Sequence, residues 1–129
     1  MRVIILEGPK SSGKTTTLQM LYAVLLSKNA KTRCPLSLVG DKDFEVVFAY
    51  RDKKVAIFSQ GDITKNCKEV ITKYTNSADV LIMAHRSDLS ELKISPPHTS
   101  EVVKKKEAED PLSRMQANAK DCKTIENAI

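Results

Sequence analysis

The most constraining feature of this chain is the segment from Arg2 to Ser27, where a short apolar run, a glycine-containing loop and a long apolar helical pattern follow one another. The run RVIIL (Arg2 to Leu6) is continuous rather than alternating, which is typical of a strand covered on both faces in a parallel sheet. From Lys14 to Ser27 the leucines recur at helical spacing and predict a mostly buried helix. A strand that passes directly into a helix in this way indicates an α/β fold.

The loop between these two elements begins with Gly8, continues for four residues, and ends with Gly13, Lys14 and Thr15. Backbone N–H groups in such a loop can surround an anion, and the following helix directs the positive end of its dipole at the same point. Glycine permits backbone angles and close approaches that a side chain would forbid. The spacing therefore predicts a site for phosphate groups.

The stretch GPKSSGKT (Gly8 to Thr15) resembles the Walker A motif of the P-loop nucleoside triphosphatase superfamily. The resemblance implies an Mg²⁺-bound triphosphate, with ATP favoured over GTP. It also implies that Lys14 lies between the β- and γ-phosphates, that Thr15 ligates Mg²⁺ and that Thr16 reaches the α-phosphate. The implied nucleotide-binding set is Gly8, Pro9, Lys10, Ser11, Ser12, Gly13, Lys14, Thr15 and Thr16.

The rest of the chain continues the alternation of strands and helices. Runs at 44–50 and 54–60 are joined by a short charged turn and predict a hairpin whose first strand lies at an edge. A helix is expected after Gly61, a buried strand at 78–85, a turn of helix and a loop at 86–99, and a strand at 100–108. Asp110 and Pro111 mark the start of a last helix, with an apolar stripe at Leu112, Met115, Ala119, Cys122, Ile125 and Ile129.

This order predicts a single α/β layered domain over residues 1–129. Together with the resemblance to the P-loop superfamily, it implies one P-loop nucleotide-binding domain built as a three-layer, P-loop NTPase-like sandwich. We expect a mostly parallel sheet of about five strands, with helices on both faces and one antiparallel hairpin edge strand.

Asp62 is the carboxylate nearest to the place where the resembled superfamily often has a metal-ordering Asp, at the end of a second buried strand. The strand end itself holds Ser59 and Gln60, which could position water or the metal shell or be plain polar residues. Asp62 has two interpretations, a catalytic and metal-ordering residue together with Thr15, or the cap of the following helix.

Arg86 follows the next buried strand and is a candidate for a catalytic contact to phosphate alongside Lys14. His85 could carry a proton or simply end the strand. The sequence HRSD has a slight likeness to the guanine-reading motif of GTPases, but only Asp88 fits, so we reject that interpretation.

The segment from Lys31 to Phe44 is expected to be a loop, in the place where the resembled superfamily has an acceptor-binding or switch segment. Arg33 is its best candidate for a ligand-facing residue, and Thr32 is a weaker switch candidate. Asp41 and Asp43 are interpreted as turn residues around Gly40.

Composition narrows the class of protein but not its partners. No apolar run approaches the ~20 residues of a membrane helix, and the start of the chain lacks a signal-peptide core, so a cytoplasmic protein without membrane attachment is expected. Three scattered cysteines predict neither disulfides nor a zinc site. The net charge of +5 fits a phosphate-bearing partner.

These features leave three functions open. The first is a small Mg²⁺-dependent NTPase or phosphotransferase whose acceptor is unknown. The second is a non-catalytic nucleotide-binding sensor, or a subunit that works with a protein partner. The third, which depends on net charge alone, is a nucleic-acid-binding protein.

Overall fold

The computed structural model describes residues 1–39 and 42–129, so the turn expected at Gly40 and Asp41 lies outside the described residues. Its elements, in chain order, are β1 (Arg2–Gly8), α1 (Lys14–Ser27), β2 (Lys31–Val39), β3 (Asp43–Tyr50), β4 (Lys53–Phe58), α2 (Thr64–Tyr74), β5 (Val80–Arg86), β6 (Thr99–Lys104) and α3 (Pro111–Ala128).

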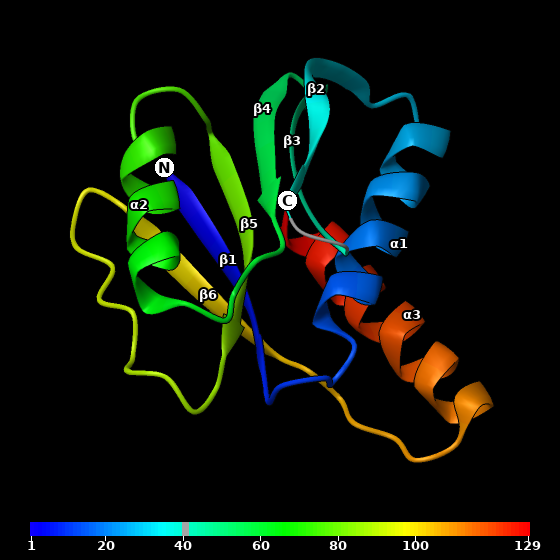
Figure 1. The fold of residues 1–129 in the computed structure, drawn as a ribbon. Helices are drawn as coiled ribbons and strands as arrows, with labels where there is room; N and C mark the ends of the chain where they lie inside the picture. The colour runs from blue at the N-terminus through cyan, green and yellow to red at the C-terminus, as the bar shows by residue number, and fades with distance from the viewer. Residues whose placement is uncertain (40–41) are drawn as a thin grey trace.

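The strands form one mixed sheet in the order β2-β3-β4-β5-β1-β6. β1 pairs in parallel with β5 and β6, and β4 pairs in parallel with β5, whereas β2, β3 and β4 pair antiparallel. Helices α1 and α3 cover one face and α2 covers the other (Figure 1). The predicted α/β class and the predicted hairpin are both confirmed.

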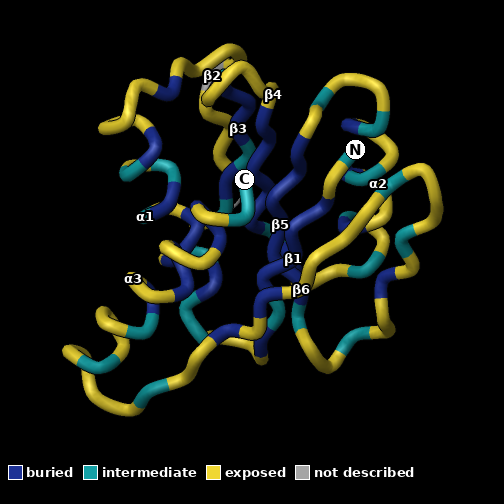
Figure 2. The backbone as a smooth tube through the Cα atoms, turned by 180° about the vertical axis from the view of Figure 1, so that it is seen from behind, coloured by how far each residue is buried: buried dark blue, intermediate teal, exposed yellow. Residues whose placement is uncertain are grey.

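The core lies on both faces of the central strands, which are buried along their lengths (Figure 2). Alternate residues of β1 point to opposite faces: Ile4 and Leu6 pack toward α1 and α3, and Val3 and Ile5 pack toward α2. This two-sided burial explains why the run is continuously apolar. Gly8 is the last residue of β1, so it lies at the carboxyl end of the central parallel strand.

The expected loop from Lys31 to Phe44 is wrong, because Lys31–Val39 forms the edge strand β2. β3 is therefore an inner strand and not the predicted edge, and the sheet has six strands instead of about five. The pairing of β2 with β3 is irregular between Thr32 and Ser37, and a proline is tolerated on an edge strand. A polar, proline-containing edge strand gains its order from its neighbour and leaves little periodicity to detect.

Two further expectations need correction. Residues 87–98 form no helix; instead, backbone hydrogen bonds from Leu89 N to Arg86 O and from His98 N to Ser95 O close two separate turns. The buried stripe of α3 begins later than predicted, since Leu112 and Met115 are about two-thirds exposed, at 64% and 63%, and Ala119 is exposed too. The first buried residue of the predicted stripe is Cys122. The first turns of α3 extend beyond the sheet (Figure 1), so they have nothing to pack against.

The start of α3 matches its prediction. Asp110 is the N-cap, and its Oδ1 accepts a hydrogen bond of 2.9 Å from Ser113 N.

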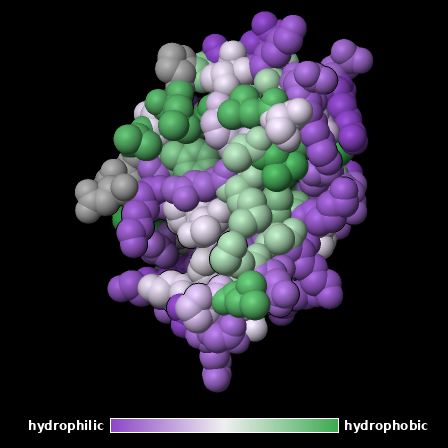
Figure 3. All heavy atoms as spheres, turned by 90° about the vertical axis from the view of Figure 1, so that its right-hand side faces the viewer, coloured by the Kyte–Doolittle hydropathy of each residue, from purple (hydrophilic) through white to green (hydrophobic). Residues whose placement is uncertain are grey.

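Seen from the side of α1 and α3, the surface has a central hydrophobic band bordered by hydrophilic residues (Figure 3). Among the described residues, no helix has the length and apolar character needed to cross a membrane.

Candidate functional site

The loop between β1 and α1 takes a path that depends on its two glycines. Gly13, the N-cap of α1, has a φ of 91°, in the left-handed region. A Cβ at this position would come within 2.9 Å of Asn118 Oδ1. A Cβ on Gly8 would come within 2.7 Å of the Lys105 Cβ. Both glycines therefore lie where a side chain would collide with the protein itself, and Gly13 has the backbone angle that favours glycine.

This path directs hydrogen-bond donors into the space at the start of α1. The first N–H groups of a helix have no partners within the helix, and those of α1 follow directly after Gly13. Nearby, Ser12 Oγ is buried without a hydrogen-bond partner among the described residues. Unpaired donors beside the positive end of a helix dipole are suited to an anion.

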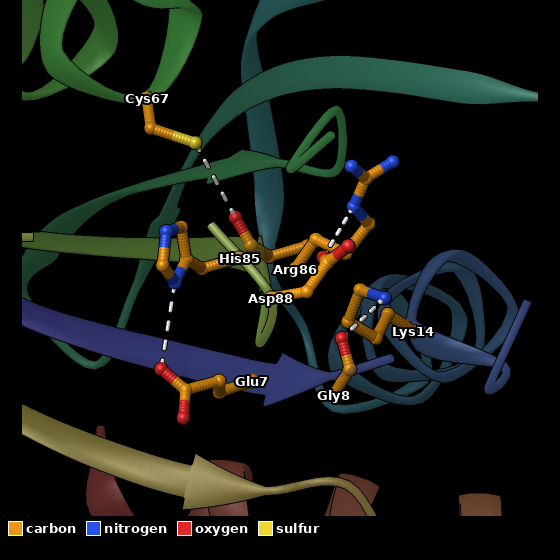
Figure 4. Close-up of polar contacts among 8 residues, drawn as sticks. Glu7, Gly8, Lys14, Cys67, His85, Arg86 and Asp88 are labelled. Carbon is orange, nitrogen blue, oxygen red and sulfur yellow. Dashed lines mark hydrogen bonds and ion pairs between the residues drawn. The ribbon is translucent and has the colours of Figure 1, made fainter. Parts of the chain in front are cut away.

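Lys14 is the first residue of α1, and its side chain folds back over the loop. Its Nζ donates to Gly8 O at 3.0 Å (Figure 4). It also donates to Pro9 O at 2.7 Å. Burial lowers the pKa of Lys14, and the carboxylate of Asp62 opposes this effect. An ammonium has three N–H donors, so one is left for a ligand. A desolvated cation at this point favours a bound anion.

Thr15, the next residue, meets a carboxylate from the antiparallel hairpin. Thr15 Oγ1 donates to Asp43 Oδ1 at 3.0 Å, and Ser59 Oγ donates to the same oxygen at 2.9 Å. Ser59 is itself fixed, because its Oγ accepts from Phe44 N at 2.8 Å. Three elements, α1, β3 and the end of β4, therefore bring a carboxylate and two hydroxyls together.

The interpretation of Asp43 as only a turn residue is therefore wrong. The contact between Asp43 and Thr15 joins residues 28 positions apart in sequence. One sequence signal, a strand-start Asp in the segment expected to face the ligand, could have marked it. Asp41, its companion in that interpretation, lies outside the described residues.

The donor set at Asp43 suits a hard cation. Mg²⁺ prefers oxygen ligands, retains several waters and usually takes one or two protein carboxylates together with substrate phosphates. Thr15 and Asp43 offer such oxygens beside the loop, with Ser59 behind them. No group of three or more His, Cys, Asp or Glu side chains forms a metal site among the described residues. A cation here would depend on ligands from water and from a bound anion.

Asp62 is not the cap of α2, so that interpretation is wrong. The N-cap is Ile63, and no side chain caps this helix. Asp62 is exposed and lines the same cavity as Lys14 and Thr15. The preceding residue, Gly61, is fixed against β5, because its carbonyl accepts a hydrogen bond of 3.0 Å from Arg86 N. A Cβ added at Gly61 would lie only 2.4 Å from the Ala84 backbone.

The two polar residues at the end of β4 are both engaged. Ser59 is buried, and its hydroxyl donates to Asp43 Oδ1. The side-chain oxygen of Gln60 accepts a hydrogen bond of 3.1 Å from Asn66 Nδ2 of α2. Gln60 is therefore already paired within the protein.

Arg86 ends β5 directly beside the loop, since it faces Gly8 in the β1–β5 register. Its Nε donates to Asp88 Oδ1 at 2.6 Å, and the side chain is one-quarter exposed. Both residues lie on the same side as Lys14 in Figure 4. Arg86 and Asp88 influence the Lys14 pKa with opposite sign, after burial and Asp62. The structure thus brings the three predicted catalytic residues Lys14, Asp62 and Arg86 to one edge of the sheet.

His85 points away from this group, toward the face covered by α2. It is 1% exposed, and its Nδ1 lies 3.4 Å from Glu7 Oε2 (Figure 4). Its Nε2 is buried without a partner among the described residues. The alternation of side chains along β5 separates His85 from Arg86 and from Lys14.

Two adjoining cavities surround the start of α1. One, of about 350 Å³, is lined by the loop together with Lys42, Asp43, Ser59 and Asp62. The other, of about 520 Å³, is lined on its far side by Lys106, Glu107, Ala108, Arg114 and Asn118. Both share Ser11, Ser12, Gly13 and Thr16. One elongated ligand can therefore occupy both across the loop.

A buried ion pair fixes the wall of the 520 Å³ cavity. Lys105 Nζ lies 3.1 Å from Asp121 Oδ2, with side chains only 1% and 2% exposed. The same carboxylate accepts from Lys106 N at 2.9 Å, and Lys105 N donates to Glu7 O at 2.7 Å. The segment after β6 is thereby tied to both β1 and α3.

The remaining candidates lie elsewhere. Arg33 lies on β2 and lines a different cavity, described below. Thr32 Oγ1 is hydrogen-bonded to Tyr22 Oη at 2.5 Å and does not reach the loop cavities. Both predictions assumed a flexible loop where the chain forms an edge strand.

Comparisons of this chain with protein-family models, curated proteins and solved structures give no match. Inferences about its function therefore depend on the geometry described above.

Proposed function

We propose that this protein is a small P-loop nucleotide-binding protein with a P-loop NTPase-like fold, which holds an Mg²⁺-bound nucleoside triphosphate on residues Gly8 to Thr16. In this proposal the phosphates lie in the 350 Å³ cavity and the nucleoside lies in the adjoining 520 Å³ cavity.

The observation that carries the proposal is the placement of Lys14 and Thr15 at the first turn of α1. Lys14 offers a desolvated ammonium with a donor to spare, and Thr15 meets the Asp43 carboxylate at 3.0 Å. A cation for phosphate and an oxygen pair for Mg²⁺ thus stand side by side. Bound Mg²⁺ would offset negative charge on the phosphates.

The reaction class that fits best is phosphoryl transfer or hydrolysis, which depends on positioning and electrostatics more than on covalent chemistry. Lys14 would stabilise charge that develops on the transferred phosphoryl. Arg86 would contact the same group through its two Nη atoms, because Asp88 engages Nε. Asp62, exposed in the cavity, would orient water around the metal.

A second candidate function is nucleotide binding with slow or no turnover, and the contacts of Gln60 favour it. Gln60 is paired with Asn66, so it is not free to orient an attacking water. Residues 87–98, the segment available as a lid, form no regular element. A sensor, or a subunit of a larger assembly, would need only the binding half of the site.

Calorimetric titration with Mg-ATP and Mg-GTP, together with a phosphate-release assay, tests both candidates. We expect Lys14→Ala to weaken triphosphate binding by about 100-fold, because a charge-assisted contact in a buried setting is lost. Lys68→Ala, on the exposed face of α2, makes the same charge change and should bind like wild type. Unaltered affinity in Lys14→Ala would contradict the site. Tight binding without phosphate release or transfer would favour the second candidate.

A further inference from the structure

A third cavity, of about 600 Å³ and called the basic cavity below, lies at the other end of the sheet from the loop. It is bounded by the start of β2, the turn between β3 and β4, and the residue that precedes β5. These segments lie at the top of Figure 1, whereas α1 begins near the bottom. The cavity is therefore separate from the proposed nucleotide site.

The charged lining of this cavity is mainly cationic. Five basic side chains contribute to it and only two acidic ones, Asp52 and Asp79. The five are all exposed, and they come from three parts of the hairpin and edge strand: Lys31, Arg33, Arg51, Lys53 and Lys54.

Their charges are not neutralised within the described part of the chain, where none of the five forms an ion pair with a carboxylate. Arg51 lies over the Tyr50 ring, 5.0 Å from its centroid, and Lys53 Nζ donates to Ile129 O at 3.0 Å. Asp79 Oδ2 accepts instead from a backbone group, Lys54 N, at 2.8 Å. Asp79, one of the two acids that line the cavity, therefore already accepts a hydrogen bond from the backbone.

We propose that this cavity is a second anion site, which binds phosphate groups through Arg33 and Arg51 with help from the neighbouring lysines. Guanidinium groups match phosphate oxygens in geometry, and a concave cationic surface concentrates anions. The phosphates can belong to a small polyphosphate or to the backbone of a single-stranded nucleic acid. The site does not depend on the proposed nucleotide site.

The test uses protein that carries Lys14→Ala, so that the loop site does not contribute. Fluorescence anisotropy would follow a labelled oligothymidylate, and calorimetry would follow inorganic tripolyphosphate. We expect Arg33→Ala/Arg51→Ala to weaken binding of at least one probe by about tenfold or more. The control Lys65→Ala/Lys68→Ala removes the same charge from α2 and should change affinity by less than about twofold.

The two probes distinguish the source of the phosphates. Binding of tripolyphosphate without binding of the oligonucleotide would assign a small ligand. Binding of the oligonucleotide, with a steep loss of affinity between about 50 and 200 mM salt, would assign a nucleic-acid backbone. The proposal is overturned if neither probe binds, or if the arginine variant and the α2 control lose affinity equally.

Discussion

The two ends of the sheet hold their cations in different ways. At the carboxyl end, Lys14 donates to two carbonyls, Arg86 is paired with Asp88, and Lys105 is buried against Asp121. At the amino end, the basic residues of the basic cavity are exposed and form no ion pair with an Asp or Glu side chain in the described chain. Fixed cations define positions for ligand atoms, whereas loosely held ones supply mainly charge. We therefore expect geometric specificity at the first end and salt-dependent attraction at the second.

The largest stability effect expected at the carboxyl end comes from its buried ion pair. Asp121→Asn leaves Lys105 buried without a counter-charge and should lower the free energy of unfolding by about 3 kcal/mol. Urea denaturation measures this directly. Lys31→Ala at the amino end is the matched comparison, and its exposed side chain should cost less than about 0.5 kcal/mol. Equal losses in the two variants would contradict the claim that only one end is rigidly held.

Asp43 provides the next test, because it distinguishes a carboxylate fixed by hydrogen bonds from one that is only nearby. Asp43→Asn should weaken Mg-ATP binding by about tenfold and should leave binding of ATP in EDTA nearly unchanged, since the Asp43 carboxylate would serve the metal.

Asp62→Asn makes the same charge change in the same cavity and sharpens that test. Asp62 makes no side-chain hydrogen bond to the described residues around the loop, so we expect less than about a threefold loss of Mg-ATP affinity. Calorimetry with and without Mg²⁺ measures both variants. A larger loss in Asp62→Asn than in Asp43→Asn would assign the metal-ordering role to Asp62, as the sequence first suggested.

The smallest effect concerns Glu126, which joins α3 to the end of α1. Lys28, at 2.5 Å, lowers the pKa of Glu126, and Lys123 acts in the same direction. A carboxyl whose pKa is lower in the folded state stabilises the fold above its unfolded pKa of about 4.3, and this stabilisation is lost as pH falls through the folded value. Glu126→Gln should therefore cost about 0.5 kcal/mol at neutral pH and almost nothing near pH 3. A pH-independent difference between the two melting curves would contradict the assignment.

Sequence was sufficient for the features that are encoded locally. The loop between β1 and α1 follows from the spacing of Gly8 and Gly13, and the start of α3 follows from Asp110 and Pro111, because each signal lies within one turn of the element that it specifies. The hairpin turn was equally local, with Arg51 and Asp52 both at positive φ.

The features that were missed depend on distant partners. β2 exists because β3 pairs with it: its sequence includes a proline, and none of its described side chains is buried. Asp43 reaches Thr15 only because the sheet places β3 beside the first turn of α1. The wrong prediction for Leu112 and Met115 has a similar origin, since helical periodicity does not report where the sheet ends.

The most direct test of the central claim is an amide-resolved NMR titration of the wild-type protein with Mg²⁺ and a non-hydrolysable ATP analogue. The account predicts that the largest shift changes fall on residues 8–16 and 106–108, with Asp43 and Ser59 also affected. Changes confined to residues 31–33 and 50–54, or no saturable change anywhere, would contradict it.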